Sequence, residues 1–191
     1  MTDIAELLKP NQTDLPSAFC LKLAHFGAIS LVGEEQTKYL QGQVTCDVNA
    51  SEENNLMVGA HCDAKGKVLS VFRLINRDQK HLLIQPKTTI TESLAALKKF
   101  GVFAKVEIEQ ESKLALAVFA GEDAQAAVKT LFNTIPDGIS PVIQVGETTI
   151  AYIAGSIPKF LLIDSSENLD RHISASELPQ LNDSVWTLLE I

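Results

Sequence analysis

The chain has 191 residues, 46% hydrophobic and 21% charged, a composition typical of a globular protein that can bury a sizeable core. Its net charge of −8 argues against an extended nucleic-acid-binding surface, because phosphate contacts need clustered lysine and arginine. No apolar run approaches the roughly 20 residues that cross a bilayer, and three cysteines without a CxxC pair argue against a disulfide framework, so we expect a cytoplasmic protein with no membrane contact and no direct nucleic-acid binding.

The first half of the chain predicts strands with two helices between them. Polar residues and two prolines predict an extended arm at 1–17, and the apolar pattern that follows predicts a pair of strands joined by a turn near His25, Phe26 and Gly27. A helix is expected at 34–43, because glycine at position 42 commonly ends a helix. The other elements expected in this half are strands at 56–62, 68–76 and 81–85, a helix at 91–100 and a strand at 102–108.

The second half follows a polar break at 110–112 and alternates short strands with helices. Strands are expected at 114–120, 142–145, 148–154 and 160–163, and helices at 122–132 and 167–176. This order predicts a ferredoxin-like α+β subdomain. We therefore expect a first subdomain at 1–111, a ferredoxin-like subdomain at 112–180, and a segment at 181–191 that begins the return to the first subdomain.

Few residues of the chain suggest catalysis or metal binding. His61, Cys62 and Asp63 are adjacent, and on a strand they would point to alternating faces and could not converge on one ion. The sequence contains no GxSxG or HExxH motif and no cysteine with a recognisable histidine partner. We therefore assign no catalytic residue and no metal ligand.

Two features remain open between a structural and a binding interpretation. The turn that holds Asp63, Lys65 and Lys67 predicts either a solvated hairpin or a cationic turn that faces an anion. Phe26 and Trp186 are either core aromatics or platforms for a flat heterocycle. Residues 1–112 carry 12 basic and 14 acidic side chains while 113–191 carry 4 and 10, so an anionic ligand would settle more readily on the first half.

The segments 38–48 and 60–67, together with 97–100 and 102–106, resemble the YgfZ family, folate-binding proteins of tRNA modification and iron–sulfur maintenance that are related to the glycine-cleavage aminomethyltransferase. This resemblance implies an aminomethyltransferase-like, folate-binding α+β fold. It also implies tetrahydrofolate or another folate derivative as ligand, with Phe26 and Trp186 as stacking walls. Asp63, Lys65 and Lys67 are expected to contact the pterin edge or the glutamate tail. The implied role is that of an accessory protein for iron–sulfur enzymes, including those that methylthiolate tRNA.

The chain also departs from its relatives in ways that affect function. Ser70 and Val71 stand where the aminomethyltransferases carry a pair of aspartates, so no group is expected to steer proton transfer there, and we expect no independent catalytic activity. The family's cysteine signature, Lys-Gly-Cys-Tyr-x-Gly-Gln-Glu, is absent, and we interpret the chain as the N-terminal part of a longer member or as a shortened member. The alternatives are a folate-dependent one-carbon transfer enzyme and an interaction domain without ligand.

Overall fold

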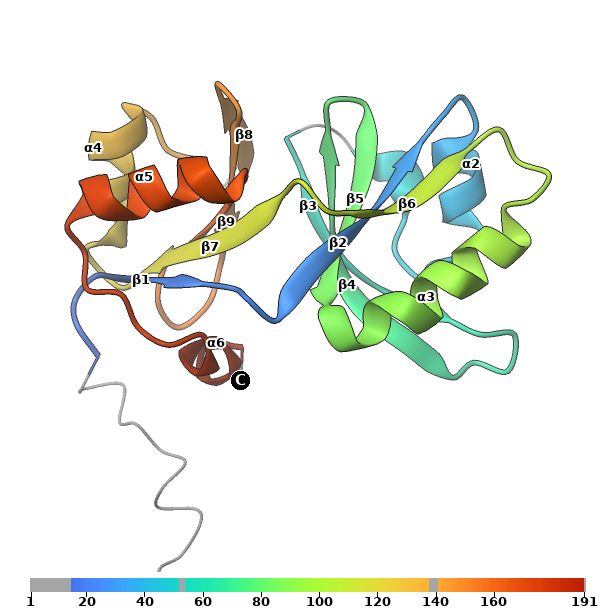
Figure 1. The fold of residues 1–191 in the computed structure, drawn as a ribbon, viewed down its shortest axis with the longest axis horizontal. Coiled ribbons are helices and arrows are strands. Elements are labelled where there is room, and N and C mark those ends of the chain that lie inside the picture. Colours follow the sequence, from blue (N-terminus) through green and yellow to red (C-terminus); the bar gives the residue numbers. More distant parts are fainter. Residues whose placement is uncertain (1–14, 52–53, 138–140, 191) are drawn as a thin grey trace, which may run out of the picture.

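Two five-stranded antiparallel sheets with helices on their outer faces make up the protein (Figure 1). The computed structural model describes residues 15–51, 54–137 and 141–190, so most of the arm expected at 1–17 lies outside the described residues. The strands of the first sheet, in spatial order, are β1 (Phe19–Lys22), β7 (Ala115–Ala120), β10 (Lys159–Asp164), β9 (Thr148–Ile153) and β8 (Val142–Val145). Those of the second are β3 (Leu56–Cys62), β4 (Val68–Arg77), β5 (Lys80–Pro86), β2 (Phe26–Val32) and β6 (Glu107–Glu111).

The helices cover each sheet on the face away from the other sheet. The second sheet buries Leu83 and its neighbours against α2 (Gln36–Gln41) and α3 (Lys87–Phe100), with a short 3₁₀ turn at Val48–Ala50 beside them. The first sheet buries Phe119 and Phe160 against α4 (Ala124–Phe132) and α5 (Ser166–Ser176). Between the sheets, Ala28, Ile75 and Ile84 of the second sheet pack with apolar residues of the first, and α6 (Ser184–Leu189) joins this shared core.

The strand pair predicted around 25–27 is wrong, because β1 and β2 lie in different sheets. β1 pairs with β7, whereas β2 pairs with β5 and β6. Leu23, Ala24 and His25 carry the chain across from one sheet to the other, and the segment between β6 and β7 makes a second crossing beside it (Figure 1). Phe19, Cys20 and Leu21 are fully buried, so β1 is fixed by burial on both of its faces rather than by a local hairpin.

The predicted α+β fold class is confirmed, and the first sheet shows how its ferredoxin-like part is completed. The chain order β7, α4, β9, β10 and α5 follows the β-α-β-β-α sequence of that motif, with β8 added at the far edge. The position beside β7 is filled by β1, from the N-terminal part of the chain. The subdomain division after residue 111 remains a proposal, and any such unit includes this strand.

Two elements begin several residues away from their predicted starts, and one helix was not predicted. α3 begins at Lys87 rather than at 91, directly after Pro86, whose carbonyl accepts a hydrogen bond from the Thr89 hydroxyl. β6 begins at Glu107 rather than at 102, because Val102 and Phe103 lie in an exposed turn and their apolar character does not reflect burial in a sheet. The six-residue helix α6 was not predicted.

Among the helices that the structure describes, none is long and apolar enough to cross a membrane.

Candidate functional site

The two predicted aromatic residues meet although they are 160 positions apart. Phe26 begins β2 and Trp186 lies in α6, with ring centroids 6.2 Å apart and planes at 86°, an edge-to-face contact. Both line a cleft of about 300 Å³, together with Leu23, His25, Asn182, Asp183, Ser184 and Thr187. The structure therefore brings both predicted stacking residues to one cleft.

Main-chain hydrogen bonds explain why α6 reaches β2. The Cys20 amide donates to the Pro179 carbonyl at 3.0 Å, and the Leu181 amide donates to the Cys20 carbonyl at 2.8 Å. The segment after α5 therefore runs parallel to β1, with Cys20 opposite Gln180. It delivers α6 to the point where the chain leaves β1 for β2.

Two cationic side chains, those of Arg73 and Lys159, contact α6 and the residue that follows it. The guanidinium of Arg73, on β4, lies 5.4 Å from the Trp186 ring centroid and forms an ion pair with Glu190. Lys159 Nζ donates to the Leu189 carbonyl at 2.8 Å, and burial lowers the pKa of this amine. Trp186 is only 4% exposed, so nearly all of its ring is covered by protein and Phe26 is the more accessible of the two aromatic walls.

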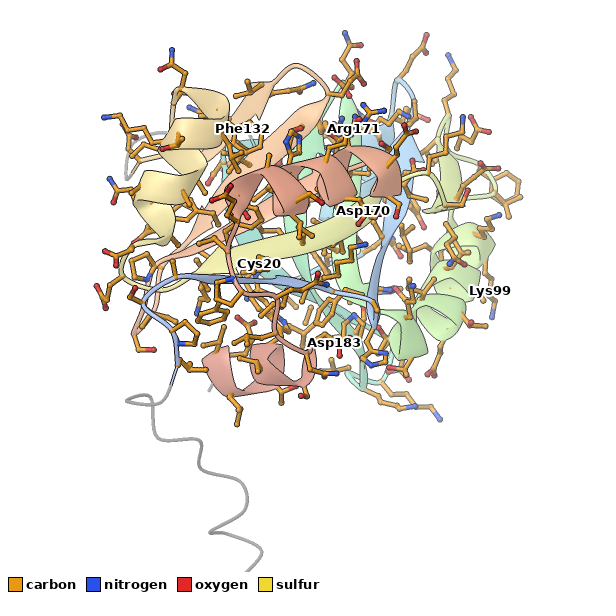
Figure 2. The ribbon with its side chains drawn as sticks, turned by 60° about the vertical axis from the view of Figure 1, so that its left-hand side comes forward. Cys20, Lys99, Phe132, Asp170, Arg171 and Asp183 are labelled. Atoms are coloured by element: carbon orange, nitrogen blue, oxygen red, sulfur yellow. The ribbon has the colours of Figure 1, made fainter. Side chains whose placement is uncertain are left out.

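The polar groups of this cleft include two buried atoms without hydrogen bonds to described residues, Asp183 Oδ2 and Trp186 Nε1. Asp183 lies where the chain enters α6 (Figure 2), with His25 Nε2 at 3.3 Å from Oδ2. Buried carboxylates and indole N–H groups normally have partners. Both atoms are covered by protein, so a polar heterocycle in the cleft can reach them only if neighbouring side chains move.

The predicted turn residues lie elsewhere. Asp63 Oδ1 accepts hydrogen bonds from the amides of Lys65 at 2.8 Å and Lys67 at 2.9 Å, so this carboxylate holds its own turn together. Lys67 Nζ lies 3.3 Å from Glu92, and Lys65 is exposed. Arg73 lies six positions after Lys67 along β4, about 20 Å of extended chain, so the structure does not bring the turn together with the aromatic pair.

Ser70 and Val71 also differ in their surroundings. Ser70 is buried, and its hydroxyl lies 3.4 Å from that of Ser93, which in turn lies 2.9 Å from His61 Nδ1. Val71 is 56% exposed. Neither side chain can take up a proton at neutral pH in place of a carboxylate.

Among the described residues, the lining of this cleft contains no cysteine. Burial raises the pKa of the Cys20 and Cys46 thiols, which disfavours the reactive thiolate. Within residues 15–51, 54–137 and 141–190, no group of three histidine, cysteine or acidic side chains is placed to hold a metal ion.

Sequence analysis missed Arg73, Asp183 and His25. A charged residue in the middle of the apolar strand at 68–76 was the one available signal for Arg73. Asp183 and His25 gave none, because the cleft depends on how the chain crosses between the sheets.

Comparison with known proteins identifies relatives of the chain. A tRNA-modifying protein YgfZ from Colwellia psychrerythraea is 50% identical over 182 residues, 95% of this chain and 56% of that protein. A tRNA-modifying protein YgfZ from Serratia proteamaculans is 35% identical over 173 residues, 90% of this chain and 52% of that protein. The chain thus spans about half the length of the curated relatives it matches. A scan of family models finds no match.

Solved structures agree on the fold. The glycine cleavage system aminomethyltransferase T from Bartonella henselae superposes with a TM-score of 0.74 at 12% identity, over 86% of this chain and 48% of that one. The heterotetrameric sarcosine oxidase from Corynebacterium sp. U-96 superposes with a TM-score of 0.54 at 9% identity, over 83% of this chain and 81% of that one. The aminomethyltransferase-like fold expected from the sequence is confirmed.

Proposed function

We propose that this chain, a homologue of the YgfZ proteins over 95% of its length, binds a reduced folate in the cleft that Phe26 and Trp186 both line. We further propose that it acts as an accessory protein for iron–sulfur enzymes, including those that methylthiolate tRNA, in the cytoplasm. The meeting of Phe26 and Trp186 at one cleft carries the ligand proposal. The name shared by its relatives, tRNA-modifying protein, supports the role.

The chemistry of the cleft suits a pterin ring. A volume of about 300 Å³ is at the lower end of the range for small-molecule sites, enough for a bicyclic ring but not for a whole folate. The exposed part of Phe26 supplies a stacking face. The Asp183 carboxylate can accept from the amino group and ring N–H of the pterin, in the two-point manner that carboxylates favour. Asp63, Lys65 and Lys67 remain proposed contacts only for a tail that extends along β4.

A fluorescence titration tests the ligand proposal. Trp186 is the only tryptophan, so its emission reports directly on an adjacent pterin. We expect a saturable change with tetrahydrofolate and its formyl derivative, and Phe26→Ala should weaken binding by about 1–3 kcal/mol if the ring stacks on the ligand. Phe103→Ala is the matched control, because that ring is 98% exposed in the turn after α3. A flat titration on folded protein would contradict the proposal.

Aminomethyl transfer provides the test of the enzyme alternative. With Ser70 and Val71 in place of two carboxylates, we expect no release of ammonia or methylene-tetrahydrofolate from an aminomethyl-loaded lipoyl carrier. Turnover clearly above the protein-free background would favour a one-carbon transfer enzyme.

The accessory role has its own measurement. The chain is supplied to a bacterial strain that lacks its YgfZ protein, and tRNA methylthiolation is scored. Rescue that Phe26→Ala abolishes and Phe103→Ala leaves intact would support both proposals. Absence of rescue by the wild-type chain would remove the accessory role from these residues without affecting the folate titration.

A further inference from the structure

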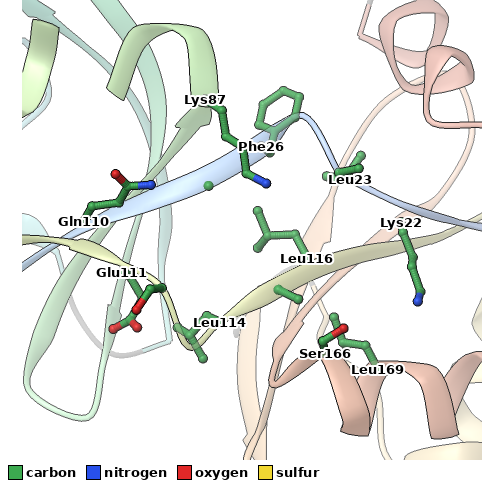
Figure 3. Close-up of a pocket in the computed structure, with 14 residues that line it drawn as sticks. Lys22, Leu23, Phe26, Lys87, Gln110, Glu111, Leu114, Leu116, Ser166 and Leu169 are labelled. Atoms are coloured by element: carbon green, nitrogen blue, oxygen red, sulfur yellow. The ribbon is translucent and has the colours of Figure 1, made fainter. Parts of the chain in front are cut away.

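A second and larger cleft lies where the two connections between the sheets cross (Figure 3). The passage from β1 to β2 borders one side, the passage from β6 to β7 borders another, and the first turn of α5 closes a third. Its volume is about 420 Å³, within the range of small-molecule sites. Neither the aromatic cleft nor the predicted turn accounts for it.

The floor of this cleft is apolar. Leu23, Leu114, Leu116 and Leu169 line it, and three of them are nearly fully buried in the protein, at 4%, 6% and 1% exposure for Leu23, Leu116 and Leu169. A polar rim surrounds the leucines and includes Gln110, Ser112 and Ser166. A ligand that fits must therefore combine an apolar body with a polar end.

The charge of that polar end follows from Lys87. This lysine is the first residue of α3, and its stem lies along Gly27: a Cβ at position 27 would come 3.4 Å from Lys87 Cγ and 3.7 Å from Cε. The absence of a side chain at Gly27 thus lets the stem fold down, and Figure 3 shows Lys87 extending over the cleft toward Leu116. No acidic side chain stands in the first turn of α3, so the positive end of the helix dipole adds to the ammonium charge.

The other charged groups of the lining already have partners. Lys22 forms an ion pair with Asp170 on α5, and Glu111 Oε1 accepts a hydrogen bond from the Lys113 amide at 2.9 Å. Lys87 forms no ion pair with any residue that the structure describes. Among the described residues, Lys87 is therefore the lining cation without an ion-pair partner, whereas the Glu111 carboxylate keeps its negative charge at the end of β6.

We propose that this cleft binds a small amphipathic carboxylate, with its apolar body on the leucines and its carboxylate on Lys87. The site is distinct from the proposed folate cleft, but Phe26 lines both. Occupation of one cleft therefore contacts a wall of the other. The ligand would also contact both connections between the sheets. These connections link the two sheets and so help to determine how the sheets are positioned.

The test uses para-trifluoromethylbenzoate as probe, followed by fluorine NMR and by amide NMR of the protein. The neutral para-trifluoromethylbenzyl alcohol has nearly the same shape without the charge. We expect millimolar binding of the carboxylate, weaker binding of the alcohol, and amide shifts centred on Gly27, Lys87 and Leu116. Lys87→Gln should weaken the carboxylate about three- to tenfold, the size of a partly exposed charge-assisted contact.

Lys98→Gln is the matched control, because Lys98 lies on the same helix at its exposed opposite end. The proposal is overturned if the carboxylate does not bind, if Lys87→Gln and Lys98→Gln bind it equally, if the alcohol binds as tightly, or if the shifted amides lie elsewhere. The assay contains no folate, so its failure would leave the folate titration unaffected, and the reverse also holds.

Discussion

Gly121→Ala should destabilise the protein more than a glycine substitution normally does. Gly121 follows β7 with φ +113°, a conformation that L side chains rarely adopt, and a Cβ there would lie 2.3 Å from the Ser17 carbonyl oxygen and 2.8 Å from its carbon. The backbone conformation alone costs about 1–3 kcal/mol in a residue other than glycine. The contact must then be relieved by moving the segment that enters β1.

The additional cost can be worked from what Ser17 holds. Its carbonyl accepts a hydrogen bond from the Asp123 amide at 2.9 Å, a contact worth about 0.5–1.5 kcal/mol. Forcing a methyl group into packed surroundings costs about 1–3 kcal/mol more. We therefore expect Gly121→Ala to lower the free energy of unfolding by about 2.5–7.5 kcal/mol in total.

Gly66→Ala isolates the conformational part of this effect. Gly66 has φ +81°, and nothing lies within 4 Å of a Cβ built there, so only the backbone cost applies. Urea unfolding followed by Trp186 emission measures both variants. If Gly121→Ala and Gly66→Ala differ by less than about 1 kcal/mol, the crowding argument built on Ser17 is incorrect.

Three further outcomes are expected. Burial lowers the pKa of His61 and His81 below the ordinary value of 6.5. As the pH drops below about 6.5, the unfolded chain therefore binds protons before the folded protein does, and the free energy of unfolding should fall. A His61→Asn/His81→Gln double variant should show a shallower fall in urea titrations from pH 7 to 5. Asp164 is 3% exposed and accepts hydrogen bonds from Thr148, Ser165 and Asn168. Asp164→Asn should therefore lower the free energy of unfolding by about 2–4 kcal/mol. The control Asp170→Asn, which removes an exposed ion pair with Lys22, should lower it by under about 1 kcal/mol. Arg73→Met removes the contact with the Trp186 ring and the ion pair with Glu190, so α6 should be held less firmly and acrylamide should quench Trp186 more strongly. The exposed variant Arg171→Met is the control. Equal quenching in the two variants would contradict a role for Arg73 in holding α6.

Local patterns in the sequence predicted most elements because residues close together in the sequence form the buried face of each element. β3, α4, β8 and α5 lie within two residues of their predicted bounds, since alternation or helical spacing of apolar residues marks the buried face directly. The pairing of β1 is different. Its partner β7 is almost 100 residues away, and a short connection such as 23–25 is equally compatible with a hairpin and with a crossing between sheets.

The candidate site could be predicted only in part for the same reason. Phe26 and Trp186 were named through a resemblance, and composition alone would place both in the core. Asp183 and Lys87 carried no signal, because each gains its role from the neighbour that the fold supplies: Trp186 for Asp183, and the bare backbone of Gly27 for Lys87.

Both clefts depend on β1, and this links stability to binding. β1 is held on one side by β7 and on the other by the segment that leads to α6, through the bonds of Cys20 with Pro179 and Leu181. A displacement of β1 therefore moves Phe26, which follows it by only a few residues, and Trp186, which the parallel segment carries. Gly121→Ala, which crowds the entry to β1, should consequently weaken the proposed folate binding even where the protein remains folded. A variant with lowered stability and unchanged folate affinity would show that the aromatic pair is positioned by α6 and β2 alone.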